Sequence, residues 1–284
     1  MSIERVGVIG GGLMGSGIAE VCARAGSEVI VHEINAEAAE AAIGRIENSL
    51  DRAVERGKLD ETGRSDILSR IALSTDLTDQ ADRQLVVEAA TENEDLKKRI
   101  FTNLDEIVTD SNAILASNTS SIPITRIASA TSRPDHVVGL HFFNPVPVMA
   151  LVELVTTVMS DPDVEDRAQA YAENVGKTVI RAKDRAGFVV NMLLIPFLLG
   201  AVRMYETGVA TKEDIDTGMR LGANHPMGPL ELADFVGLDT TKYVADVLFE
   251  EFKEPMYASP PLLTRMVEAG LHGRKTGQGF YEYE

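Results

Sequence analysis

A glycine-rich turn near the N-terminus constrains the fold of this 284-residue chain more than any other feature. Gly10, Gly12 and Gly15 form a G-x-G-x-x-G pattern between the apolar run RVGVIG and the helical stretch GGLMGSGIAEVCARAG. Such a turn lets backbone N–H groups and the start of the helix face a pyrophosphate. The pattern alone is a weak signal, but a strand before it and a helix after it predict a dinucleotide-binding unit.

A carboxylate ends the next predicted strand, 18 residues after Gly15. Glu33 could accept a hydrogen bond from an adenosine ribose 2′-OH, and it would repel a 2′-phosphate. The three residues that follow, Ile34 to Ala36, include no arginine that could bind such a phosphate. The sequence therefore favours NAD over NADP as the cofactor.

Strand-like and helical segments alternate over the first two thirds of the chain. Further apolar runs lie at 84–90, 113–118 and 136–143, and helical stretches lie at 36–56, 61–71 and 96–108. Buried parallel strands are continuously apolar, and alternation with helices implies parallel pairing. After about Lys183 only helices are predicted, at 187–207, 211–221, 228–235, 239–252 and 260–269. We expect an α/β Rossmann-like domain with a parallel sheet over 1–184 and an all-α domain over 185–284.

Charge and cysteine content narrow the partners and the compartment. Lys and Arg number 27 against 44 Asp and Glu, a net charge of −17, which argues against nucleic acid or an anionic membrane as partner. A polyanionic ligand would need a local basic pocket. The one cysteine, Cys22, excludes an internal disulfide, suits a reducing compartment such as the cytoplasm, and lies among small apolar residues that indicate a core position. We expect no metal.

The longest apolar stretch is too short and too interrupted to cross a membrane. It covers 187–202, contains Asn191 and Pro196, and falls short of the roughly 20 residues that a span needs. The N-terminus enters a strand-like run at once, so we expect no signal peptide. We expect the apolar helix to be buried against the first domain, a partner subunit or both, and we predict a homodimer through the helical domain.

One histidine and one acid are the only titratable groups in the apolar run GLHFFNPVPVMALVELV at 139–155. His141 ends a predicted parallel strand, at the sheet edge where ligands bind. Imidazole titrates near neutrality and can accept the proton of an alcohol as hydride leaves for a nicotinamide. A turn at Pro145–Pro147 could return the chain so that Glu153 fixes the imidazole tautomer, although spacing alone also allows Glu153 to cap or pair elsewhere. For the other histidines, a structural role is expected: His32, His136, His225 and His272.

Several motifs resemble one family over essentially the whole chain. They are ASNTSS (116–121), GLHFFNPVPVM (139–149), GFVVN (187–191), HPMGPLEL (225–232), GLDTT (237–241) and GRKTGQGFY (273–281). Together they are similar to the 3-hydroxyacyl-CoA dehydrogenases, and above all to the stand-alone bacterial 3-hydroxybutyryl-CoA dehydrogenases. The resemblance implies a Rossmann-like domain, a helical dimerisation domain, and oxidation of (3S)-3-hydroxyacyl-CoA with NAD.

The resemblance also implies roles for individual residues. The family's catalytic pair matches His141 and Glu153, its active-site serine matches Ser120, and its asparagine matches Asn191, the last two also expected to bind substrate. The residues expected near the cofactor are Gly10, Gly11, Gly12, Leu13, Met14, Gly15, Glu33, Glu92, Lys97, Ser120, Asn144 and Lys275. Ser120 as an ordinary helix cap and Asn191 as a helix-start residue remain open alternatives.

The phosphates of coenzyme A need cations, and the helical stretch at 45–58 supplies them. Arg52 and Arg56 are four residues apart and share a helix face, with Arg45 and Lys58 nearby. A solvated charged face is an equally good interpretation of these residues.

Two other functions remain to be considered. The β-hydroxyacid dehydrogenases share a G-x-G-x-M-G opening but use a lysine on the first interdomain helix, and 187–202 contains none. A protein that binds NAD without catalysis is the second alternative, and the joint presence of His141, Glu153, Ser120 and Asn191 argues against it.

Overall fold

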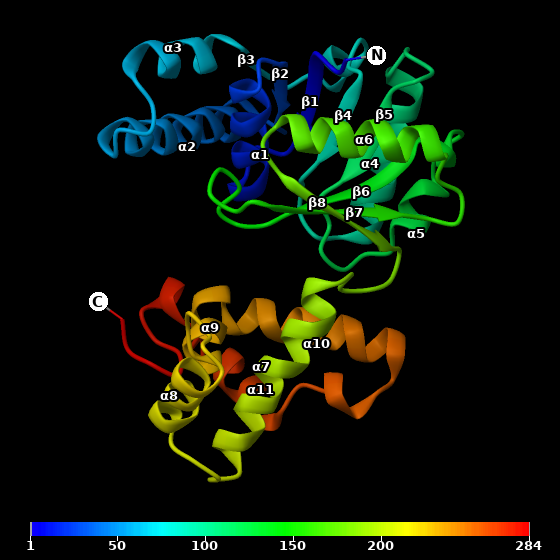
Figure 1. Cartoon of the computed structure of the whole chain (residues 1–284). Coiled ribbons are helices and arrows are strands. Elements are labelled where there is room, and N and C mark those ends of the chain that lie inside the picture. The colour runs from blue at the N-terminus through cyan, green and yellow to red at the C-terminus, as the bar shows by residue number, and fades with distance from the viewer. Residues whose placement is uncertain (1, 284) are drawn as a thin grey trace. The chain divides into compact units, whose positions relative to one another are not determined.

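Eight strands form one sheet in the first of the two units of the computed structural model (Figure 1). This unit extends to Arg185, the second begins at Ala186, and the structure describes residues 2–283. The strands follow the order β3-β2-β1-β4-β5-β6-β7-β8 across the sheet. Their bounds are β1 (Arg5–Ile9), β2 (Glu28–His32), β3 (Ile71–Ser74), β4 (Leu85–Glu88), β5 (Ile114–Ser117), β6 (Val137–Phe142), β7 (Leu151–Thr156) and β8 (Thr178–Lys183).

The predicted Rossmann-like fold is confirmed, with the last two strands, β7 and β8, running opposite to the other six. Every neighbouring pair is parallel except β6 and β7, which are antiparallel. The reversal follows from the short connection between these two strands, because parallel strands need a much longer crossover. The sheet is therefore mostly, not wholly, parallel.

Six helices belong to the same unit: α1 (Leu13–Arg24), α2 (Ala36–Glu55), α3 (Glu61–Ser69), α4 (Glu94–Ile107), α5 (Ile124–Ala128) and α6 (Pro162–Asn174). Asn35 and Asn93 begin α2 and α4 by accepting hydrogen bonds from backbone N–H groups of the first turn. The helix predicted over 61–71 is too long at its end. It stops at Ser69, and Ile71 starts β3 because it pairs with Val29 of β2.

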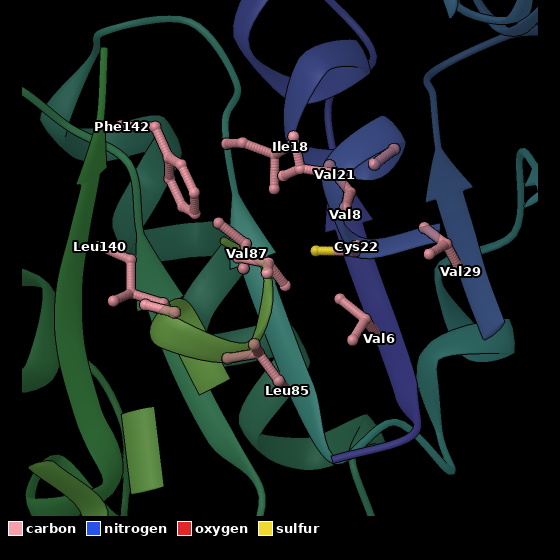
Figure 2. Packing of buried hydrophobic residues seen from close by; sticks show 14 of the residues in the cluster. Val6, Val8, Ile18, Val21, Cys22, Val29, Leu85, Val87, Leu140 and Phe142 are labelled. Carbon is pink, nitrogen blue, oxygen red and sulfur yellow. The ribbon is translucent and has the colours of Figure 1, made fainter. Parts of the chain in front are cut away.

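Alternation along the strands gives the two faces of the sheet different characters. Figure 2 shows Val8 of β1, Val87 of β4 and Leu140 of β6 packed in one apolar cluster with residues of α1 such as Ile18. The cluster also takes in residues of α6. Because successive side chains of a strand point to opposite faces, the neighbours of these residues face the other way. On that second face the described strands bury four polar side chains: Glu88, Ser117, His141 and Glu153.

The second unit is built from five helices, as predicted for an all-α domain. They are α7 (Val190–Glu206), α8 (Lys212–Gly222), α9 (Pro229–Val236), α10 (Leu238–Phe252) and α11 (Pro261–Glu268). Leu198, Leu230 and Leu248 are fully buried in its core. Asp234 accepts hydrogen bonds from the backbone of Phe280 and Tyr281, so it fastens the C-terminal segment to α9. Among residues 2–283, no helix is long and apolar enough to cross a bilayer.

Candidate active site

The glycine turn between β1 and α1 is shaped for close approach of a ligand. Gly10 has φ +93°, a conformation that favours glycine, and a Cβ at Gly15 would lie 1.7 Å from the carbonyl oxygen of Gly10. A Cβ at Gly12 would meet nothing within 4 Å. Backbone conformation therefore explains Gly10 and close packing explains Gly15, whereas Gly12 keeps open the space in front of the first turn of α1. A pyrophosphate at the helix N-terminus would use that space.

Glu33 directly follows β2, beside this turn. Its Oε1 accepts a hydrogen bond of 2.6 Å from the backbone N–H of Gly11, and the N–H of Gly10 donates to the carbonyl oxygen of His32 at 2.9 Å. The carboxylate is thus held at the edge of the glycine turn, where a ribose hydroxyl could reach it. These residues fit a bound NAD.

His141 and Glu153 are brought together by the reversal between β6 and β7. They are directly opposite in the antiparallel register, and Nδ1 of His141 lies 2.6 Å from Oε2 of Glu153. Both are buried, with 6% and 0% of their surface exposed, and the ring of Phe143 lies 4.6 Å from the imidazole centroid. A carboxylate in this position favours the tautomer with the proton on Nδ1, in which Nε2 is the basic nitrogen of the ring.

The segment after β5, which carries Ser120, is held by Glu92. Oε1 of Glu92 accepts hydrogen bonds from the backbone N–H of Ser120 at 3.2 Å and from the hydroxyl of Ser121 at 3.0 Å. Lys97 of α4 is buried, and its ammonium lies 3.4 Å from Oε2 of Glu92. The structure therefore joins three residues that the sequence could only associate through the family resemblance.

Sequence reasoning missed two residues that shape the surroundings of His141. Oδ1 of Asn118 accepts a hydrogen bond of 2.9 Å from the backbone N–H of Phe142, so it ties the segment after β5 to the end of β6. Lys177 donates to the carbonyl oxygens of Val146 (2.5 Å) and Met149 (2.8 Å) and so supports the turn between β6 and β7. Asn118 lies within the ASNTSS motif, but no local pattern marks Lys177.

A pocket of about 220 Å³ lies between α1, α2 and the turn after β6. Arg45 and Arg52 line it together with Asn144, and Arg45 also donates to the carbonyl oxygen of Gly11 at 3.2 Å. Arg56 is exposed and is not among the lining residues. Two arginines beside the cofactor turn make this pocket suitable for phosphate groups.

A second pocket, of about 330 Å³, lies in the helical unit and has the opposite charge. Four carboxylates line it, against a single arginine: Glu213, Asp216, Glu231 and Glu282. Like charges repel, so this pocket does not suit a polyanion.

Two predicted site residues belong to the helical unit. Asn191 lies in the first turn of α7 and is partly exposed. Lys275 pairs through Nζ with Oδ2 of Asp239 at 2.6 Å. The remaining predicted residues all lie in the unit that contains the sheet.

The four other histidines lie at element ends or contact neighbouring residues. His32 ends β2, and burial lowers the pKa of its imidazole. His136 closes a 3₁₀ turn before β6, the His225 ring packs 5.2 Å from that of Phe197, and Nε2 of His272 lies 3.2 Å from the carbonyl oxygen of Val267.

Comparison with known proteins decides the family. Residues 5–185 match the model of the 3-hydroxyacyl-CoA dehydrogenase NAD binding domain, and residues 187–283 match that of the 3-hydroxyacyl-CoA dehydrogenase C-terminal domain. The chain belongs to the 3-hydroxyacyl-CoA dehydrogenase family. The resemblance inferred from the motifs is thereby confirmed, as are the assignments to oxidoreductases and to NAD as cofactor.

Members of the 3-hydroxyacyl-CoA dehydrogenase family resemble the chain over its full length. A 3-hydroxybutyryl-CoA dehydrogenase of Mycobacterium tuberculosis is 57% identical over 283 residues, 99% of each chain. The crystal structure of M. tuberculosis FadB2 superposes with a TM-score of 0.99 at 56% identity and full coverage of both chains. The (S)-3-hydroxybutyryl-CoA dehydrogenase PaaH1 of Ralstonia eutropha gives 0.95 at 46% identity, again with full coverage.

Proposed function

We propose that the protein oxidises (3S)-3-hydroxybutyryl-CoA to acetoacetyl-CoA with NAD and catalyses the reverse reduction. The buried pair of His141 and Glu153 is the observation that carries this proposal, because it places a carboxylate 2.6 Å from one nitrogen of an imidazole that can act as a proton acceptor. The preference for a four-carbon acyl group is supported by the names of relatives that match the chain over its full length.

His141 acts as the general base in the oxidation. Nε2 accepts the proton of the substrate hydroxyl, while Glu153 on Nδ1 holds the ring in position and stabilises the imidazolium that forms. The glycine turn and Glu33 would hold NAD, which when bound would accept the hydride from the carbon that bears this hydroxyl. In the reverse direction, imidazolium returns the proton to the carbonyl oxygen.

Ser120 and Asn191 are proposed to bind the reacting oxygen of the substrate. A hydroxyl and an amide can each donate a hydrogen bond to an oxygen on which negative charge develops. The coenzyme A phosphates are proposed to bind Arg52, with Arg45 alongside it in the pocket of α2. Arg56, the other predicted contact, would have to act from outside that pocket.

The helical unit is proposed to form the interface of a homodimer. Large apolar side chains are exposed on α7 and α8, with Leu193 at 71% and Leu221 at 82%. A second copy of the chain would remove such side chains from water. Light scattering at micromolar concentration tests this, and a monomer would contradict it.

The oxidation of NADH on addition of acetoacetyl-CoA tests the proposed reaction. We expect turnover that stops without the thioester, and in a series of 3-ketoacyl-CoA substrates from C4 to C16 we expect the highest kcat/KM at C4. A protein that binds NADH but gives no turnover would favour a purely NAD-binding role. A maximum at long chains would refute the four-carbon assignment.

A further inference from the structure

A second buried acid–base pair lies on the same face of the sheet as His141 and Glu153. Oε1 of Glu88, the last residue of β4, lies 2.6 Å from Nζ of Lys97 on α4. The exposed fractions of the two residues are 0% and 1%. Removing two charges from water offsets most of their attraction, so such a pair is weak evidence for a role in stability. Its role is better inferred from the groups that the two charges hold.

The two charged groups contact the segment that follows β4 and the last residue of β5. Oε1 of Glu88 accepts from the backbone N–H of Ala90 at 2.7 Å, and Oε2 accepts from the hydroxyl of Ser117 at 2.6 Å. The ammonium of Lys97 also lies 3.4 Å from the carbonyl oxygen of Ala90 and 3.4 Å from Oε2 of Glu92. Lys97 is thus the only cation in the described ion pairs of Glu92.

Glu92 connects Lys97 to the segment that carries Ser120. Its Oε1 accepts from the hydroxyl of Thr119 at 2.5 Å, from the backbone N–H of Ser120 and from the hydroxyl of Ser121. The hydroxyls of Ser117, Thr119 and Ser121 are therefore all used to hold the chain. Ser120 contributes only its backbone N–H to this network, which leaves its hydroxyl for a ligand.

We propose that Lys97 and Glu88 are positioning residues that act through Glu92 to present the Ser120 hydroxyl to the substrate. The proposal rests on the proposed function, in which Ser120 binds the reacting oxygen. Lys97 holds one oxygen of Glu92, so the other stays aimed at residues 119–121. A change of about 1 Å in the position of a substrate-binding group can reduce the rate about 100-fold.

Two simpler roles make different predictions. If the pair served stability alone, restoring stability would restore activity. If Lys97 bound the cofactor directly, its removal would weaken NADH binding without requiring Ser120. The burial of Lys97 and the engagement of its ammonium by two carboxylates favour the indirect role.

A double-mutant cycle with acetoacetyl-CoA and NADH tests the proposal. Kinetics and the Kd of NADH are measured for the unmodified protein, Lys97→Met, Ser120→Ala and the variant with both changes. Lys98→Met is the matched control, because Lys98 follows Lys97 on α4 but pairs with Glu94 at the surface. The variant Glu88→Gln with Lys97→Met removes both buried charges, so it leaves no unpaired buried charge that could unfold the protein. Thermal unfolding measures the stability of each variant.

The expected result is that Lys97→Met lowers kcat by about 10- to 100-fold, while the Kd of NADH changes by less than about threefold. In the Ser120→Ala background the same substitution should change kcat by no more than about threefold, because residues that act as a unit are not additive. The variant without either buried charge should melt close to the unmodified protein yet keep the low kcat. Lys98→Met should retain normal kinetics.

Three results would overturn the proposal: fully multiplicative effects of Lys97→Met and Ser120→Ala, normal kcat in the Glu88→Gln, Lys97→Met variant, or a loss confined to NADH binding. An unmodified protein that fails to reduce acetoacetyl-CoA would instead overturn the proposed function, and this role with it. The two failures are therefore distinguishable.

Discussion

The two faces of the sheet differ in what they bury, although the same strands supply both. On one face, Leu140 and its neighbours pack with α1 and α6 in an apolar cluster. On the other, which we call the polar face, His141 pairs with Glu153 and Glu88 pairs with Lys97 through short polar contacts. Apolar burial stabilises without direction, whereas each buried polar group needs a partner in a defined place. We therefore infer that the buried polar pairs of the second face serve the proposed chemistry, whereas apolar burial, which occurs on both faces, stabilises the fold.

The largest effect is expected from the polar face. His141→Ala removes the proposed proton acceptor, so kcat should fall by about 10²- to 10⁴-fold, the range of general acid–base catalysis. NADH affinity should change little, because the glycine turn at Gly10–Gly15 is untouched. Steady-state kinetics and an NADH titration check both. A kcat within threefold of normal would remove His141 from the mechanism.

The adjacent residue should give the opposite result. Leu140→Ala leaves a cavity in the apolar cluster, so the free energy of unfolding should fall by about 2–5 kcal/mol. Below its melting temperature the variant should keep kcat near normal, because Leu140 points away from His141. Urea unfolding and kinetics at low temperature test this pair of neighbours. Loss of kcat in a folded Leu140→Ala protein would break the division between the faces.

Cofactor choice should depend on Glu33 at the end of β2. A hydrogen bond to a charged group is worth about 1.5–3 kcal/mol, so kcat/KM for NAD should exceed that for NADP by at least about tenfold. Glu33→Ala should reduce this preference, mainly by weakening the use of NAD. Parallel assays with both cofactors measure it, and equal use of NADP by the unmodified protein would contradict the role of Glu33.

The smallest effect is expected at Cys22, on the apolar face. Burial raises the pKa of its thiol to about 11, so very little thiolate is present at pH 8. The native protein should react slowly with iodoacetamide at that pH and lose no activity, whereas the urea-unfolded chain should react readily. Rapid labelling of native protein would show that this side of the core is open to solvent.

The sequence predicted the parts of this comparison that depend on local pattern. The glycine turn, the five helices of the second unit and the position of His141 at a strand end all follow from periodicity and motif spacing. The prediction of a helix over 61–71 is wrong at Ile71, which begins β3, because the pairing of β3 with β2 is not encoded locally.

Long-range contacts account for what the sequence could not predict. Turn residues at 145–147 suggested that Glu153 could reach His141, but register between β6 and β7 decides it. Asn118 bonds a residue 24 positions away, and Lys177 bonds residues 28 and 31 positions away. Glu88 bonds residues 9 and 29 positions away. No spacing rule marks such pairs, because the folded sheet alone brings them together.

The kcat of Glu153→Gln tests the central claim most directly. Glutamine keeps the shape of the side chain but lacks the charge that stabilises the imidazolium. Because an amide can donate or accept a hydrogen bond, it also no longer selects one tautomer of His141. The account predicts a fall in kcat of about 100-fold or more in a protein whose circular dichroism and NADH affinity are normal. A folded Glu153→Gln protein with unchanged kcat would show that Glu153 has only a structural role, and that His141 and Glu153 are not a catalytic pair.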